Sequence, residues 1–169
     1  MKRITKIVIA LILVVSTLSG CSDAFSDDQT ERFYTYEELM IGIPGNFGDQ
    51  SAEYWAAPLA FYYSYGGHAV FATKKPREEV EAEHPGMTAL EYAQDFAKGT
   101  TVTEPVEEKD GLILFCHTMT NDDGEAFSYL CSAYVSTSYY WLIQCSCPSD
   151  MLSESREGMT KILRSVTVQ

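Results

Sequence analysis

Three stretches of the chain are apolar at consecutive positions, where a surface strand would alternate apolar and polar residues. They are residues 61–63 (FYY), 112–115 (LILF) and 140–143 (YWLI). Successive side chains of a β-strand point to opposite faces of its sheet, so a strand with one face in water alternates. We therefore expect these strands to bury both faces.

Turn-forming residues separate the strands that this pattern predicts. We expect strands over residues 38–44, 59–64, 69–73, 112–120, 126–135, 139–147 and 165–168. Gly66-Gly67 tolerates the positive φ angles of a tight hairpin turn, and Asp123-Gly124 is typical of a two-residue hairpin loop. The sheet is therefore expected to be antiparallel. Lys74-Lys75-Pro76 is expected to end the third of its strands.

Two amphipathic stretches predict helices. Thr88 and Glu91 have the spacing of a capping box, which predicts a helix over residues 89–98, and a second helix is expected over residues 153–163. The charged segment 77–83 is expected to be irregular or a short helical turn. An antiparallel sheet that is buried on both faces, with two helices to cover it, indicates an α+β fold of the α/β/α sandwich type.

The order of these elements resembles the PsbP-like fold. The resemblance rests on a strand ending MIGIP (Met40–Pro44), the aromatic hairpin, the TALEYA helix (Thr88–Ala93), three antiparallel strands and a terminal helix that runs into ILRSVTV (Ile162–Val168). It spans about residues 34–169. Proteins of this fold include bacterial envelope lipoproteins of the DcrB type. The resemblance implies a non-enzymatic binding or accessory module and transfers no functional residue to this chain.

The N-terminus has the pattern of a signal peptide. Lys2, Arg3 and Lys6 precede an uncharged run at residues 7–19. As a helix this run reaches about 20 Å, which falls short of the roughly 30 Å hydrocarbon core of a bilayer. Residues 1–20 are therefore expected to be removed after export.

The segment Leu18-Ser19-Gly20-Cys21 resembles the lipobox of bacterial lipoproteins. The resemblance implies that Cys21 becomes the new N-terminus and carries a diacylglyceryl group, with fatty acids such as palmitate. Two acyl chains hold a protein stably on a membrane where one does not. We expect a protein that is lipid-anchored at the cell membrane, on its extracytoplasmic side. The alternative is an ordinary signal peptide, with Cys21 left as an unpaired thiol.

The mature chain is strongly acidic. The sequence has 12 basic and 24 acidic residues and a net charge of −12, and removal of residues 1–20 takes away three basic residues and no acidic one, which leaves −15. A chain of this charge repels nucleic acid. Residues 21–33 are polar and mostly acidic, which predicts a flexible tether, and residues 34–169 predict a single domain. Since no basic cluster is present for lipid headgroups, we expect the acyl chains alone to hold the protein at the membrane.

Four cysteines follow Cys21 in the chain. With a two-residue loop at Asp123-Gly124, Cys116 and Cys131 lie directly opposite each other, at about 5.5 Å between their Cα atoms, which is within disulfide range. They are the candidate disulfide, because export favours oxidation. The alternatives are four reduced, buried thiols, or a pairing of Cys131 with Cys145 or Cys147.

The residue types used in catalysis and metal binding form no recognisable pattern. The three histidines are scattered, and no G-x-S-x-G nucleophile elbow occurs. Cys145-Ser146-Cys147 with His117 nearby lacks the C-x-x-C spacing of zinc sites, and residues 121–125 lack the ligand spacing of a calcium-binding loop. We therefore predict no catalytic residue, no cofactor and no metal site.

Exposed aromatic side chains are the remaining candidates for a binding site. Tyr54 and Trp55 fall in a predicted loop, and Tyr139 and Tyr140 begin a predicted strand. If both pairs are exposed and adjacent they form a patch for a ligand or partner. The alternative is that they pack in the core, as strand aromatics usually do.

Together these features predict a non-catalytic, lipid-anchored binding or accessory lipoprotein. Its expected partners are the membrane, through Cys21, and an unidentified protein or envelope component. A solute- or polymer-binding lipoprotein that uses exposed aromatics is the first alternative, and an envelope enzyme of unrecognised type is the second.

Overall fold

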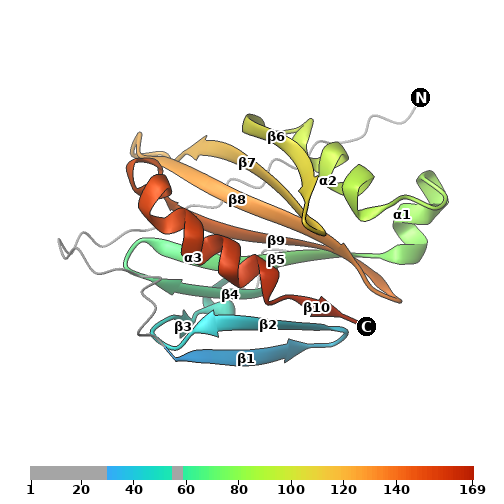
Figure 1. Cartoon of the computed structure of the whole chain (residues 1–169), viewed down its shortest axis with the longest axis horizontal. Coiled ribbons are helices and arrows are strands. Elements are labelled where there is room, and N and C mark those ends of the chain that lie inside the picture. The colour runs from blue at the N-terminus through green and yellow to red at the C-terminus, as the bar shows by residue number, and fades with distance from the viewer. Residues whose placement is uncertain (1–29, 55–58) are drawn as a thin grey trace.

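The computed structural model describes residues 30–54 and 59–169 (Figure 1). The predicted signal peptide, Cys21 and most of the predicted tether lie outside the described residues, and so does Trp55. For Tyr54 the structure describes the backbone alone. Among the described helices, none combines the length and the apolar character that crossing a bilayer requires.

A seven-stranded antiparallel sheet forms the centre of the fold, in the order β3-β4-β5-β9-β8-β7-β6. Its strands are β3 (Gly48–Asp49), β4 (Leu59–Tyr65), β5 (His68–Pro76), β6 (Thr101–Lys109), β7 (Leu112–Thr120), β8 (Ala126–Val135) and β9 (Tyr139–Pro148). The hairpin turn at Gly66-Gly67 is confirmed, with φ angles of 56° and 82°. The predicted end of the third strand is wrong, because β5 stays paired with β9 as far as Pro76.

A second, three-stranded antiparallel sheet, here called the small sheet, lies beside the large one (Figure 1). Its strands are β1 (Glu31–Tyr36), β2 (Leu39–Pro44) and β10 (Thr167–Val168), in the order β1-β2-β10. β1 was not expected from the sequence. The predicted boundary between tether and domain is therefore too late, because the backbone of residues 31–33 already pairs with residues 42–44.

Three α-helices and two short 3-10 helices complete the described chain. They are α1 (Arg77–Glu83), α2 (Ala89–Ala97), α3 (Leu152–Arg164), η1 (Ser51–Tyr54) and η2 (Ser149–Met151). The capping box that begins α2 is confirmed: the hydroxyl of Thr88 accepts from the N–H of Glu91 at 3.2 Å, and the Glu91 carboxylate accepts from the N–H of Thr88 at 2.8 Å. The segment 77–83 is a regular helix.

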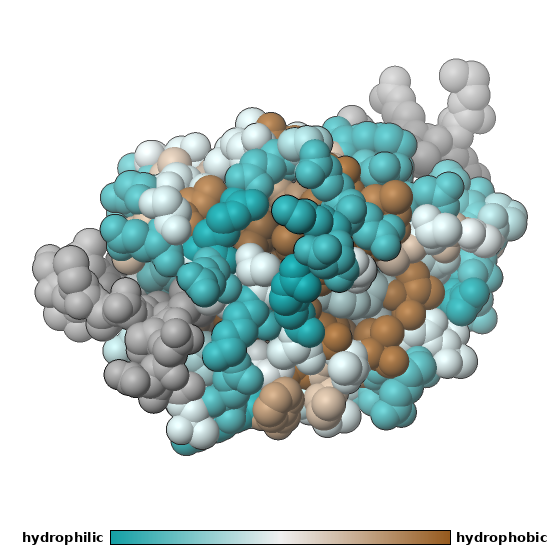
Figure 2. Space-filling view, viewed as in Figure 1, coloured by the Kyte–Doolittle hydropathy of each residue, from teal (hydrophilic) through white to brown (hydrophobic). Residues whose placement is uncertain are grey.

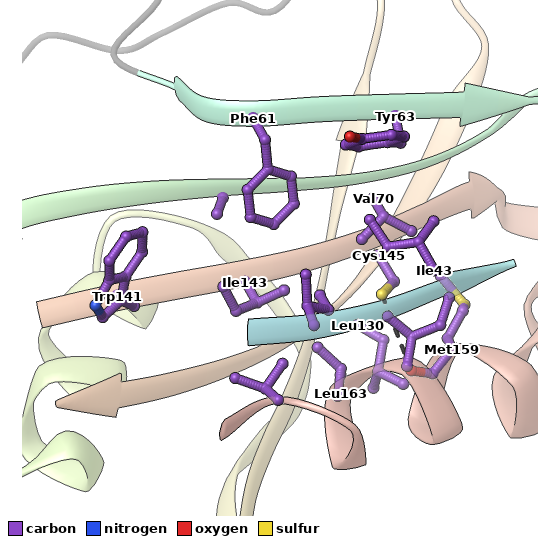
Figure 3. Close-up of a cluster of buried hydrophobic side chains, with 14 of the residues drawn as sticks. Ile43, Phe61, Tyr63, Val70, Leu130, Trp141, Ile143, Cys145, Met159 and Leu163 are labelled. Atoms are coloured by element: carbon purple, nitrogen blue, oxygen red, sulfur yellow. Dashed lines mark hydrogen bonds between the residues drawn. The ribbon is translucent and has the colours of Figure 1, made fainter. Parts of the chain in front are cut away.

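The large sheet is buried on both faces, as the consecutive apolar residues predict. Ile143 of β9 belongs to a buried cluster with Ile43 of β2 and Leu163 of α3 (Figure 3). Its neighbour Leu142 belongs to a second cluster, with Ala93 of α2. The α+β class is thus confirmed. The predicted sandwich, with helices on both faces of the sheet, differs from the structure. The face of the large sheet that carries Ile143 is covered by the small sheet together with α3.

The register of β7 and β8 separates the two cysteines of the candidate disulfide. Cys116 lies opposite Leu130, because a five-residue loop at 121–125 replaces the expected two-residue loop. A shift of one residue turns a side chain to the other face, and Cys116 and Cys131 indeed belong to different buried clusters. The predicted pairing is therefore wrong. So is a pairing of Cys131 with a cysteine of β9, since Cys131 lies opposite Gln144; all four thiols of the domain are free and buried.

Candidate functional site

Tyr139 and Tyr140, half of the predicted aromatic patch, begin β9 and point to opposite faces of the large sheet. Tyr140 is 0% exposed, while Tyr139 is partly buried. Because successive strand residues face opposite ways, the two rings cannot form one surface. The predicted patch is wrong for Tyr140, which belongs to the interior.

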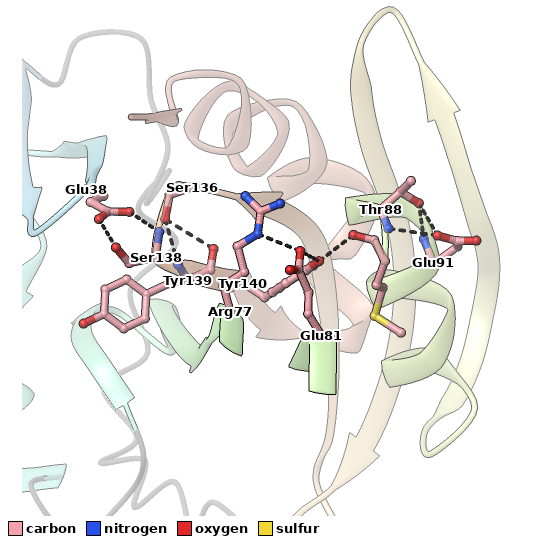
Figure 4. Close-up of polar contacts among 10 residues, drawn as sticks. Glu38, Arg77, Glu81, Thr88, Glu91, Ser136, Ser138, Tyr139 and Tyr140 are labelled. Carbon is pink, nitrogen blue, oxygen red and sulfur yellow. Dashed lines mark hydrogen bonds and ion pairs between the residues drawn. The ribbon is translucent and has the colours of Figure 1, made fainter. Parts of the chain in front are cut away.

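Tyr140 holds the segment between α1 and α2 against the large sheet through a hydrogen bond and ring packing. Its hydroxyl donates to the carbonyl oxygen of Met87 at 2.5 Å and lies 3.5 Å from Oε1 of Glu81 (Figure 4). Its ring packs against Tyr92, with the ring centroids 5.1 Å apart. Burial, reinforced by the Glu81 carboxylate, raises the pKa of Tyr140. The hydroxyl therefore stays protonated at neutral pH and serves as a structural donor.

On the other face, Tyr139 belongs to a cluster around one cation. Nζ of Lys74 lies 4.4 Å from the ring centroid of Tyr139 and 5.6 Å from that of Trp141, and it pairs with the carboxylate of Glu37. Glu37 has a φ of 53° in the turn between β1 and β2. The cluster thus holds the β1–β2 turn against β5 and β9, because the ammonium group of Lys74 contacts the Glu37 carboxylate and the two aromatic rings.

A second contact holds the same turn in place. The Glu38 carboxylate accepts hydrogen bonds from the N–H of Ser138 at 2.8 Å and from its hydroxyl at 2.5 Å (Figure 4). Oγ of Ser136 accepts from the indole N–H of Trp141 at 3.1 Å. The hydrogen bonds from Ser138 lower the pKa of Glu38, so this group is ionised at neutral pH. It caps the β8–β9 turn and is not placed to act as a proton donor.

A tyrosine cluster that the sequence did not single out lies where the small sheet meets β4. The hydroxyl of Tyr36 donates to that of Tyr63 at 2.6 Å, and the Tyr63 hydroxyl lies 3.4 Å from Oδ2 of Asp49. Tyr36 stacks on Phe61 with centroids 4.4 Å apart, and Tyr34 packs on Tyr63 at 4.8 Å. Burial raises the pKa of Tyr36. The hydroxyls satisfy one another, so the cluster joins the two sheets.

Two of the three histidines are buried. Nε2 of His68 lies 2.9 Å from Oγ of Ser155, and His117 stacks on Tyr129 with ring centroids 4.7 Å apart. Burial lowers the pKa of both histidines, so they are neutral at pH 7. His68 and Ser155 are both enclosed, and no substrate can reach them as they stand. Within residues 30–54 and 59–169, no three His, Cys, Asp or Glu side chains gather as a metal ion would require.

The small sheet has an exposed surface, here called its outer face, that sequence reasoning missed. Leu39, Ile41 and Ile43 are 0% exposed, so the alternate residues of the small sheet point away from the core. The two large apolar residues among these, Phe33 and Met40, are 60% and 38% exposed. The register places the members of the outer face side by side: Glu31, Phe33, Thr35, Met40, Gly42, Pro44 and Thr167.

A signal for this surface is present in the sequence. Arg32, Tyr34 and Tyr36 alternate with Phe33 and Thr35, and the two glutamates that follow make a turn before the next strand. The acidic composition of the preceding residues hid the alternation.

On the face drawn in Figure 2, hydrophilic residues cover much of the surface and hydrophobic ones show between them.

Comparison with known proteins establishes the fold. Neither the family models nor the sequences of curated proteins give a match. Among solved structures, cyanobacterial PsbP (CyanoP) from Synechocystis sp. PCC 6803 is similar at a TM-score of 0.55 and 8% sequence identity, covering 92% of this chain and 99% of that one. The chain thus has a PsbP-like fold, as its element order predicts.

Two further structures resemble it less strongly, both at a TM-score of 0.47 and 10% identity. The Ran-binding protein Mog1p of Saccharomyces cerevisiae matches over 83% of this chain and 96% of its own. LpqN, which is involved in cell envelope biogenesis of Mycobacterium tuberculosis, matches over 85% of this chain and 92% of its own. At TM-scores below 0.5 these two likenesses add nothing to the assignment of the fold.

Proposed function

We propose that this protein is a lipid-anchored lipoprotein whose PsbP-like domain acts outside the cytoplasm as a non-catalytic binding or accessory module. The observation that carries the proposal is the sequence of the first 21 residues: basic residues, an uncharged run that is too short to span a bilayer, and Cys21 at its end. The described domain begins ten residues after that cysteine, at Glu31.

The interior of the domain supports a binding role over catalysis. Several groups that could do acid–base or nucleophilic chemistry are buried, namely His68, His117, Ser155 and the four domain cysteines. Burial also raises the pKa of the Cys145 and Cys147 thiols, which keeps them protonated and unreactive at neutral pH. The partner is a protein or envelope component that meets the surface of the domain.

The alternative of a polymer-binding lipoprotein with exposed aromatics has less support. Tyr140 is inside the protein, and the hydroxyls of Tyr36 and Tyr63 bond to each other. A site for a sugar or another polar polymer needs such hydroxyls free, together with open ring faces.

The anchor is tested by expressing the full chain in a bacterium that is fed an alkyne-bearing fatty acid. The protein should take up the label and sediment with membranes, and Cys21→Ser should abolish both. Ser19→Ala keeps a small residue at the cleavage site and should retain the label. An unlabelled wild-type chain in the soluble fraction would overturn the proposal.

The accessory role is tested by crosslinking in intact cells. The wild-type protein should give one reproducible adduct with an envelope component, and the unanchored Cys21→Ser chain should lose it. Turnover of a small molecule by the purified protein, with no adduct in cells, would show an enzyme instead.

A further inference from the structure

The outer face of the small sheet is the first surface of the domain that follows the anchor in the chain. Nine residues, 22–30, separate Cys21 from Glu31, where β1 begins. A span of ten residues reaches at most about 35 Å when fully extended. β1 is the edge strand of the small sheet and lies at the margin of the molecule (Figure 1). A lipidated Cys21 therefore keeps this edge close to the bilayer.

The outer face has the composition of a shallow membrane contact. Phe33 and Met40 are exposed, and the other residues on this side of the sheet are Thr35, Gly42 and Thr167, with Glu31 and Pro44 at one end. The ring of Phe33 lies over Gly42, where an added Cβ would come within 3.2 Å of it. Gly42 thus leaves the space that the exposed ring occupies.

Three basic side chains lie near the small sheet, but none of them belongs to its outer face. Arg32 lies opposite the core-facing Ile43, so its exposed side chain leaves β1 on the side away from Phe33. The last turn of α3 reaches the same sheet, because Oγ of Ser165 accepts from the N–H of Gly42 at 2.8 Å, and this turn carries Lys161 and Arg164. Lys161 pairs with Glu31 of β1 at 3.1 Å, which confirms that α3 ends beside the first strand. Arg164 lies 4.0 Å from the carboxylate of Asp110, between β6 and β7, so the contact proposed below rests on apolar side chains and not on charge.

We propose that the outer face of the small sheet docks on the bilayer that holds the anchor, with Phe33 and Met40 entering the boundary between headgroups and acyl chains. The inference rests on the proposed function, because it needs the lipid at Cys21. A connection of so few residues to the anchor gives the outer face an effective concentration at the bilayer on the order of 1 mM, so even a contact with a millimolar dissociation constant is populated. The acyl chains fix the domain to the membrane, and the outer face sets its orientation.

Docking in this orientation turns the opposite edge of the large sheet away from the membrane. That edge is β6, at the far end of the strand order from β4, on which the small sheet packs. β6 carries Val102, which is 40% exposed and therefore matches Met40 in exposure. Met40 and Val102 form a matched pair of positions, one expected at the membrane and the other far from it.

The test uses the full lipoprotein, purified with its lipid and reconstituted into phosphatidylcholine vesicles. An environment-sensitive fluorophore is attached to Met40→Cys or Val102→Cys; the four domain cysteines are buried and should not react. Nitroxide-bearing lipids should quench the label at position 40 several-fold more strongly than at position 102. Adding Phe33→Ser should remove most of that difference and leave the thermal unfolding midpoint unchanged, because Phe33 is exposed.

The outcomes separate the docking from the anchor. Flotation with the vesicles and equal quenching at both positions would overturn the docking and leave the anchor standing. A bluer emission at position 40 without nitroxide quenching would show a protein on this face, either a second copy or a partner, and would also overturn the docking. A purified chain that carries no lipid and does not float would overturn both proposals.

Discussion

The burial of Tyr140 gives a prediction that separates the interior from a surface patch. Tyr140→Ala removes a fully buried aromatic ring and its hydrogen bond to Met87. Truncating a buried aromatic residue to alanine costs about 3–5 kcal/mol, and the lost hydrogen bond adds about 1 kcal/mol. We therefore expect a loss of about 4–6 kcal/mol in the free energy of unfolding, out of a total of about 5–15 kcal/mol for a domain.

Urea denaturation followed by far-UV circular dichroism measures this loss. With a slope of about 2 kcal/mol per molar urea, the midpoint of Tyr140→Ala should fall by about 2–3 M, and that of Tyr140→Phe by about 0.5 M. Tyr139→Phe is the matched control and should stay within about 0.25 M of wild type, because within residues 30–54 and 59–169 its hydroxyl makes no hydrogen bond to another segment. A Tyr140→Ala midpoint as close to wild type as the control would refute the structural argument.

Three further predictions follow from the described contacts. Thr88→Ala should lower the free energy of unfolding by about 1 kcal/mol in denaturation experiments, since it removes the hydroxyl that caps α2; no change would contradict the observed capping box. Burial lowers the folded-state pKa of His68 and His117 below the unfolded value of about 6.5, so the unfolded chain binds more protons as the pH falls below that value. The urea midpoint should therefore be lower at about pH 5.5 than at about pH 7.5, and His68→Gln should lessen this difference. An equal difference in the variant would contradict the role of His68 in the pH dependence. A thiol reagent should find the four domain cysteines reactive in urea and unreactive in the native protein, and fewer thiols in urea would reveal a disulfide.

The hydrophobic pattern predicted the centre of the fold well because it reflects burial directly. Residues 140–143 are apolar in succession, and the structure indeed buries them on both faces of β9. The hairpin at Gly66-Gly67 and the capping box at Thr88 are local interactions, encoded by a few neighbouring residues. Such features need no knowledge of the rest of the chain.

The edge strands could not be predicted in the same way. β6 has the sequence TVTEPVEEK, with Pro105 inside it and mostly exposed residues. Edge strands tolerate proline and carry charges because one side of their backbone has no partner strand. β1 likewise begins in charged residues. The local sequence of β6 therefore resembles a loop, and that of β1 resembles a tether. Pairing with the neighbouring strand makes each of them a strand.

The register of the β7–β8 hairpin depended on one side chain. Oδ1 of Asn121 accepts from the N–H of Asp123 at 3.1 Å and from that of Glu125 at 2.8 Å, and these bonds hold a five-residue loop. The expected Asp-Gly turn would have had two residues. The difference moves Cys116 by one position against β8 and turns it away from Cys131.

The exposure of the candidate site residues depended on distant segments. Tyr140 is buried because the residues that follow α1 cover it, and Phe33 is exposed because the outer face of the small sheet stays open. Both residues are aromatic strand residues, so residue type and local pattern cannot distinguish them. Only the packing of one segment against another assigns Tyr140 to the interior and Phe33 to the surface.

The identity of the N-terminal residue in membrane-extracted protein tests the central proposal most directly. Mass spectrometry of the N-terminal peptide should show a chain that begins at Cys21 and carries the added mass of the diacylglyceryl group. A peptide that begins at Met1, with an unmodified thiol at position 21, would contradict the anchor, the extracytoplasmic location and the membrane docking of the small sheet.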